Sequence, residues 1–179
     1  MDSINKNQPE QNHKDLSGKE AGEKMHELIK KAGVCFFCTA SANSNPEASR
    51  PMSVQKVDED GTCWFLSASD SHKNSDIASD AHVRLYFQGS SHSDFLVVFG
   101  LASISRDKEK IKELWEPILK TWFTEGVDDP RITVIAVKPQ TGYYWDTKHG
   151  EMVAFAKQMI GAVVGKTLDD SIEGNLKVD

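Results

Sequence analysis

The sequence predicts a mainly β fold with flanking helices (α+β), in which the strands form an antiparallel barrel. Five apolar segments follow one another between residues 34 and 105, linked by turns and one short helix. This order is typical of a barrel and not of alternating β–α units. The chain has 179 residues with 39% hydrophobic content, which fits one globular domain with a sizeable core.

Regular structure is expected to begin at Ser17. Residues 1–16 are polar and have almost nothing to bury, so we interpret them as a disordered tail. Ser17-Gly18-Lys19-Glu20 matches a capping box. Apolar residues then recur at helical spacing until Gly33, which is well placed to end a helix. We expect this helix to cover one face of the fold.

Residues 34–42 predict the first strand, and Asn43-Ser44-Asn45-Pro46 predicts a turn after it. Cys35 and Cys38 have the spacing of redox and zinc motifs, but positions three apart on a strand point to opposite faces. Cys63 is the only other cysteine, so a second metal-spaced pair is missing. The three cysteines are therefore expected to be structural thiols without a metal, which suits the cytosol.

The stretch from residue 49 to residue 73 carries the candidate site. It predicts a strand over 49–57, a turn over 58–61 with glycine at a positive φ, and an apolar strand over 62–67. A helix is expected to follow and to run through Ile77.

The start of this helix has unusual chemistry. Ser69, Asp70 or Ser71 can cap it, so His72 and Lys73 fall in its first turn. Free amides and a partial positive charge make this position prefer acidic side chains. Two basic side chains are unfavourable there unless an anion lies between them, and a hydroxyl, free amides and a lysine form a phosphate cradle. The alternative is a solvated surface lysine beside an ordinary serine cap.

Three residues predict irregular geometry. Pro51 lacks the amide that a strand ladder needs, so its strand should lie at an edge or a bulge. Gly100 lies inside a predicted strand over 95–105 and indicates a bulge or a barrel corner. Pro117 lies inside an amphipathic helix over 107–123 and should kink it or split it.

Two more segments complete the expected sheet. Residues 82–88 and 131–138 read as strands. We expect residues 139–142 to turn the chain into Tyr143-Tyr144-Trp145-Asp146.

The charge and hydropathy patterns exclude some classes of protein. A net charge of −6 argues against a broad nucleic-acid footprint. No run approaches the roughly 18 apolar residues of a membrane helix, and the polar start lacks a signal-peptide core. We therefore expect a cytoplasmic protein without a membrane or nucleic-acid partner.

The order of these parts resembles the flavin-binding half of the pyridoxamine 5′-phosphate oxidase-like split barrels. Arg-Pro-Met on one strand, an apolar strand ending in Leu-Ser, and Ser-His-Lys at a helix start carry the resemblance. The stretch LWEPILKTWFTEGVDDPRITVIAVKPQTGYYWD is similar to the narrower general stress protein 26-like group. The resemblance covers about residues 17–150, which implies one FMN-binding split-barrel domain followed by a C-terminal extension over 151–179. It implies a six- to seven-stranded antiparallel split β-barrel with a Greek-key-like order.

The resemblance also implies roles for particular residues. In this family the arginine strand lines the flavin ring, the end of the next strand touches the ring or the ribityl chain, and the basic pair holds the phosphate. The cofactor-binding residues carried over in this way are Arg50, Pro51, Met52, Ser53, Leu66, Ser67, Ser71, His72, Lys73 and Trp145. His72 departs from the family, which often has arginine there, and its charge depends on pH.

The implied function is FMN binding, with FAD as the alternative, in a homodimer that holds the cofactor at its subunit interface. The protein would be an oxidoreductase whose bound flavin exchanges electrons with a small-molecule reductant or substrate. Its catalytic residues are unknown. The sequence disfavours pyridoxamine phosphate oxidation, because it has no Arg-x-His and no arginine at all after Arg131. Whether the protein is an enzyme stays open, since a non-catalytic flavin-binding or sensing stress protein is the alternative. A haem- or deazaflavin-binding barrel is less favoured.

Overall fold

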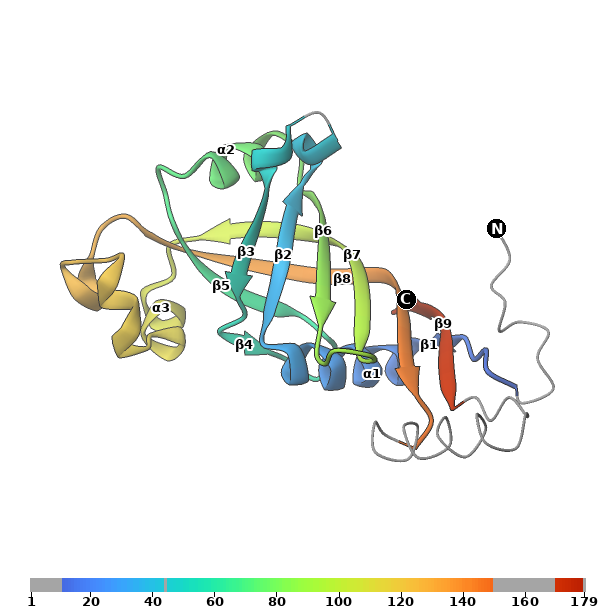
Figure 1. Cartoon of the computed structure of the whole chain (residues 1–179). Helices are drawn as coiled ribbons and strands as arrows, with labels where there is room; N and C mark the ends of the chain where they lie inside the picture. Colours follow the sequence, from blue (N-terminus) through green and yellow to red (C-terminus); the bar gives the residue numbers. More distant parts are fainter. Residues whose placement is uncertain (1–10, 44, 150–169, 179) are drawn as a thin grey trace.

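The computed structural model describes residues 11–43, 45–149 and 170–178 (Figure 1). Within these residues one sheet of nine strands has the order β1-β9-β8-β7-β6-β2-β3, and β5 joins it through β8 and also pairs with β4. The strands are β1 Leu16–Ser17, β2 Val34–Thr39, β3 Ser49–Ser53, β4 Lys56–Val57, β5 Cys63–Ala68, β6 His82–Gln88, β7 Phe95–Ser105, β8 Ile132–Thr147 and β9 Ser171–Lys177. The helices are α1 Gly18–Ala32, α2 His72–Ser79 and α3 Lys108–Leu114, and the 3-10 helices are η2 Ala40–Asn43, η3 Pro46–Ala48, η4 Pro117–Thr121 and η5 Gly126–Asp128.

The sheet curls into an open barrel whose two parts share the long strand β8. This strand pairs antiparallel with β5, β7 and β9, and all other pairings between the described strands are antiparallel except β1 with β9. β3 lies at one end of the strand order, so the sheet does not close on itself there. The predicted fold class is confirmed, and Pro51 lies on an edge strand as expected.

The turn expected over residues 139–142 is wrong, because β8 continues through it as one strand of 16 residues. Pro139 pairs with Gly100, where the register of β7 against β8 shifts, so the missing amide falls at a bulge. The bulge predicted at Gly100 is thereby confirmed. A Cβ at Gly100 would lie 2.6 Å from the carbonyl oxygen of Lys138, so this close approach requires glycine.

The sequence pattern predicts where α1 ends and where the amphipathic helix divides, but not how α1 is capped at its start. Gly33 ends α1 in the left-handed region with φ 67°, as predicted. The predicted capping box at Ser17 is not formed: Ser17 is the N-cap residue of α1, but its side chain makes no capping hydrogen bond. The amphipathic helix divides at Pro117 into α3 and η4, which confirms the expected split.

Two apolar clusters hold the elements together. The larger fills the barrel and includes the buried face of α1, and its Phe37 and Phe65 rings meet edge to face at 5.3 Å. The smaller lies between α3, η4 and the outer faces of β5 and β8, where Trp64 and Leu66 pack against Ile111 and Leu114. The side chains of β5 therefore alternate between the two clusters.

The two ends of the described chain meet at the sheet edge. β1 pairs with β9 in parallel, and His13 forms a bridge to Glu173. The expected disordered tail does not hold for residues 11–16, which lie against β9, while residues 1–10 fall outside the described part. β9 belongs to the predicted C-terminal extension yet pairs with β8; residues 150–169 also lie outside the described residues.

Candidate functional site

A group of polar side chains gathers where β5 ends and α2 begins. Ser71 is the N-cap of α2, but its hydroxyl makes no capping bond and donates instead to Asn74 Oδ1 at 3.2 Å. The hydroxyl oxygens of Ser67 and Ser71 lie 3.2 Å apart. Lys73, in the first turn of α2, donates from Nζ to Ser67 Oγ and, at 3.4 Å, to Ser71 Oγ. We call Ser67, Ser71 and Lys73, together with Arg50, the polar cradle.

Lys73 is a buried cation, with only 7% of its surface exposed. Its hydrogen-bond partners are the two hydroxyls, and no carboxylate of the described residues forms an ion pair with it. Burial, followed by the charge of Arg50, lowers the pKa of Lys73 to about 8. An anion placed here would neutralise a cation that the protein itself leaves without a counter-charge.

Arg50 brings a second cation to the cradle from β3. Its Nη2 lies 3.7 Å from Asp76 Oδ2, and its buried Nε has no hydrogen-bond partner. Asp76 is held in turn by Thr39 Oγ1, which donates to Oδ2 at 2.8 Å. The guanidinium is thus anchored at one end and keeps an unsatisfied donor at the other, which is unfavourable unless an acceptor binds there.

Two buried residues that the sequence interpretation missed support the cradle. Asn74 Nδ2 donates to Thr133 Oγ1 at 2.9 Å, and Thr133 Oγ1 donates to the carbonyl oxygen of Ser67 at 2.9 Å. Thr133 lies on β8 directly opposite Ser67. These bonds fix the end of β5 against the first turn of α2, so the positions of Ser67, Ser71 and Lys73 depend on them.

The other residues carried over from the resemblance lie in different surroundings. Leu66 packs into the smaller apolar cluster and Met52 packs against the larger one. Ser53 and His72 are exposed. Only Pro51 and Trp145 come together elsewhere, in a groove on the outer face of the sheet.

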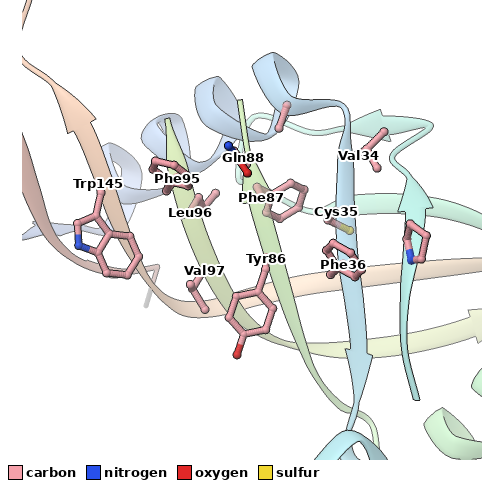
Figure 2. Close-up of a pocket in the computed structure, with 12 residues that line it drawn as sticks. Val34, Cys35, Phe36, Tyr86, Phe87, Gln88, Phe95, Leu96, Val97 and Trp145 are labelled. Carbon is pink, nitrogen blue, oxygen red and sulfur yellow. The ribbon is translucent and has the colours of Figure 1, made fainter. Parts of the chain in front are cut away.

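This groove has a volume of about 570 Å³ and an almost wholly apolar lining (Figure 2). Pro51 and Phe36 form one side, Tyr86 and Val97 lie between, and Trp145 closes the other. Trp145 is 41% exposed and its ring lies 4.6 Å from that of Tyr143. The cradle and the groove therefore flank β3, with Arg50 on one face of this strand and Pro51 on the other.

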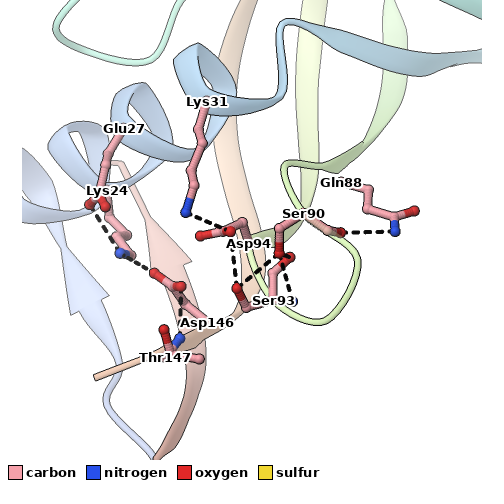
Figure 3. A network of polar contacts seen from close by, with 9 residues as sticks. All are labelled: Lys24, Glu27, Lys31, Gln88, Ser90, Ser93, Asp94, Asp146 and Thr147. Carbon is pink, nitrogen blue, oxygen red and sulfur yellow. Dashed lines mark hydrogen bonds and ion pairs between the residues drawn. The ribbon is translucent and has the colours of Figure 1, made fainter. Parts of the chain in front are cut away.

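A network of ion pairs around two buried carboxylates, Asp94 and Asp146, fixes the strand end beside Trp145 (Figure 3). Two lysines on α1 reach it: Lys24 Nζ lies 2.6 Å from Asp146 Oδ2, and Lys31 Nζ lies 2.6 Å from Asp94 Oδ2. The bond from Lys31 and those from neighbouring hydroxyls outweigh burial and hold the pKa of Asp94 below its usual range. α1 thereby positions the end of β8 next to the groove.

Other chemistry has less support in the described residues. Their three cysteines are free and buried, and burial raises the pKa of Cys35 to about 12, which disfavours a reactive thiolate. These residues contain no cluster of three or more metal-binding side chains. None of the described helices is long and apolar enough to span a membrane.

The described strands form an open barrel, and two cations and two hydroxyls gather between the end of β5 and the start of α2. Residues 20–169 match the family described as pyridoxamine 5′-phosphate oxidase like, and the chain belongs to this family.

The chain is also similar to named proteins. Protein bli-3 of Neurospora crassa is 31% identical over 127 residues, which are 66% of this chain and 61% of that protein. The chain thus matches less than two thirds of the length of this relative.

Solved structures share the fold. A putative general stress protein 26 from Jannaschia sp. CCS1 has a TM-score of 0.71 at 17% identity, covering 88% of this chain and 98% of that one. General stress protein 26 from Bacillus anthracis has a TM-score of 0.58 at 25% identity, covering 69% and 92%. The general stress FMN/FAD binding protein of Xanthomonas citri has a TM-score of 0.57 at 21% identity, covering 68% and 84%.

Proposed function

We propose that this chain is a flavoprotein that binds FMN, with its phosphate in the polar cradle. The observation that carries the proposal is a pair of cations, the buried Lys73 and the partly exposed Arg50. They have hydroxyl partners, an unsatisfied Nε and, among the described residues, only Asp76 as a counter-charge. A terminal phosphate is a dianion near neutral pH and brings three acceptor oxygens. It therefore fits this donor set better than a carboxylate does.

The residues of the polar cradle would make different contacts with the phosphate. Lys73 and Arg50 would supply charge-assisted hydrogen bonds, and Ser67 and Ser71 would donate from their hydroxyls once Lys73 turns to the phosphate. The flavin ring would lie along the free edge of β3, which pairs only with β2 among the described strands. The bound flavin would supply the electron transfer itself, and the protein would orient it and limit access to it.

The proposed assembly is a homodimer with the cofactor at the subunit interface. A site built from one strand edge and one helix start leaves most of a flavin ring uncovered, so a second subunit is needed to enclose it. The apolar groove beside Pro51, with Trp145 at its far side, gives the second subunit a surface to cover. The Xanthomonas citri protein that shares this fold is named a general stress FMN/FAD binding protein, which is consistent with flavin binding.

The proposed reaction is exchange of electrons between the flavin and a small-molecule reductant or substrate. Turnover of pyridoxamine phosphate is expected to be negligible, because the chain has no arginine after Arg131 to grip this substrate. Storage or sensing of the flavin is the competing role, because the sequence shows no acid, base or nucleophile in a recognisable constellation.

The test is to purify the protein and measure its absorption spectrum, its flavin stoichiometry and its mass by light scattering. We expect an oxidised-flavin spectrum, one FMN per chain and a dimer. A haem or deazaflavin spectrum, or a monomer that binds FMN stoichiometrically, contradicts the proposal. Anaerobic stopped-flow with reduced nicotinamide and with pyridoxamine phosphate then separates the roles, since no reduction by any physiological donor favours storage.

We predict that FMN affinity falls as the pH rises from 7 to 9. Lys73 has its pKa lowered to about 8 in the free protein, so it loses its proton through this range, whereas phosphate binding requires the charged form. For one linked proton the dissociation constant should rise by at most about tenfold per pH unit above pH 8. Fluorescence titration at each pH measures the effect, with riboflavin as the phosphate-free control. Parallel curves for the two ligands would contradict the assignment of the phosphate to Lys73.

A further inference from the structure

Two rows of side chains on the outer face of the sheet carry a single cation among uncharged residues. Strand pairing places two rows side by side across β3, β2, β6, β7 and β8. One row is Pro51, Phe36, Tyr86, Val97 and Tyr143, and the next is Ser49, Cys38, Arg84, Phe99 and Thr141. Arg84 is the only charged residue at these ten described positions.

Arg84 is held in place but its donors are not satisfied. Its guanidinium carbon lies 4.9 Å from the centroid of the Phe99 ring, and Nη1 donates to the Tyr86 hydroxyl at 3.2 Å. Its Nε is buried without a hydrogen-bond partner, and no carboxylate of the described part of the chain forms an ion pair with it. Stacking on one ring and bonding to another fixes the plane of the guanidinium, so its free donors point in a set direction.

The surroundings of Arg84 fit a second copy of this chain. Phe36 is 57% exposed and Phe99 is 42% exposed, so the rows present large apolar groups to solvent. Each copy carries a net charge of −6, and copies therefore repel one another over most of their surface. The two rows contain no carboxylate, so two copies can meet through them without apposing acidic groups. A symmetric pair would bring the same rows together.

We propose that Arg84 of each subunit donates to a neutral oxygen on the same face of the other subunit and so selects this pairing of two copies. The inference rests on the homodimer of the proposed function. Covering Arg84 without an acceptor would leave a desolvated charge, which is strongly unfavourable. The acceptors that the rows offer are hydroxyl groups and backbone carbonyls, because the rows hold no carboxylate.

The test is the dimer dissociation constant of the full chain, measured by sedimentation over a dilution series. Arg84→Met keeps the length and apolar stem of the side chain and removes its charge and donors. We expect it to weaken the dimer by about tenfold or more. Arg84→Lys keeps the charge but loses the planar fork, and should weaken the dimer less. Arg106→Met, a change at an exposed arginine outside the rows, should leave the dimer unchanged.

The outcomes separate this inference from the proposed function. Dimers of Arg84→Met that are as tight as wild type, or tighter, would show that Arg84 has no acceptor in the partner and overturn the inference alone. A wild-type protein that stays monomeric at every concentration overturns the homodimer and the inference with it. Salt screens the repulsion between two acidic copies, so with a neutral acceptor the dissociation constant should not rise between low and high salt. A dimer that weakens steeply as salt is added would contradict a neutral acceptor. If circular dichroism shows that Arg84→Met does not fold, the dimer dissociation constant of Arg84→Lys is compared with that of the wild type instead.

Discussion

Replacing Lys73 with methionine is expected to weaken FMN binding by roughly ten- to a hundredfold. Lys73 is buried beside Arg50 with only hydroxyl partners, so its charge is available to the phosphate. A charge-assisted hydrogen bond of this kind contributes about 1.5–3 kcal/mol. Methionine has a similar length and carries no charge, so the fold should tolerate it. Quenching of flavin fluorescence during titration with the variant gives the dissociation constant directly.

Two controls make this prediction specific to the phosphate. Riboflavin lacks the phosphate, and its affinity should change by less than about threefold in Lys73→Met. His72→Ala removes the neighbouring basic side chain, which is exposed, and should have little effect on FMN. Equal losses for FMN and riboflavin would instead indicate that Lys73 supports the ring or the fold. If His72→Ala loses more FMN affinity than Lys73→Met does, the phosphate binds at the exposed surface of α2 instead.

The sequence could locate the cradle but not its supports. The basic residues at the start of α2 stand out locally, because the first turn of a helix disfavours them. Thr133 and its partner Asn74 carry no such local signal. Thr133 reaches the cradle only because β8 pairs with β5, with Thr133 opposite Ser67, 66 residues earlier in the chain. Pairing between distant strands is not encoded in any short pattern, so neither residue could be assigned from its neighbours.

The same limit explains where the predicted fold differs from the structure. The strands between residues 34 and 105 could be predicted because each is a short apolar segment that ends at a turn, although the strand predicted over 49–57 divides into β3 and β4. Pro139 and Gly142 look like turn residues, yet a bulge at Gly100 on the neighbouring strand lets β8 continue past them. Likewise, residues 11–17 contain a single apolar residue, Leu16. They become ordered by parallel pairing with β9, about 160 residues later, where a Cβ at Gly174 would clash with the chain at Lys14.

The alternation of β2 predicts losses of stability of very different size for two adjacent phenylalanines. Phe37 is fully buried in the barrel, with its ring edge to face with that of Phe65 at 5.3 Å, whereas Phe36 is 57% exposed on the outer face. Phe37→Ala should lower the free energy of unfolding by about 3–5 kcal/mol, because it removes apolar contacts and leaves a cavity. Phe36→Ala should lower it by less than about 1 kcal/mol in the monomer.

The free energies of unfolding of the two variants are compared by urea denaturation. The protein concentration must be low enough for the wild type to be monomeric, because the prediction concerns the stability of a single chain. A total stability of about 5–15 kcal/mol is ordinary for a domain, so Phe37→Ala can leave little folded protein at room temperature. If it does, Phe37→Leu, which keeps most of the apolar volume, should refold and show an intermediate loss. At higher concentration Phe36→Ala should instead weaken the dimer, because its side chain lies on the face that the second copy is proposed to cover. Equal losses of monomer stability at the two positions would mean that β2 does not present opposite faces to the barrel and to the solvent. The strand register that places Arg84 on the outer face would then also be wrong.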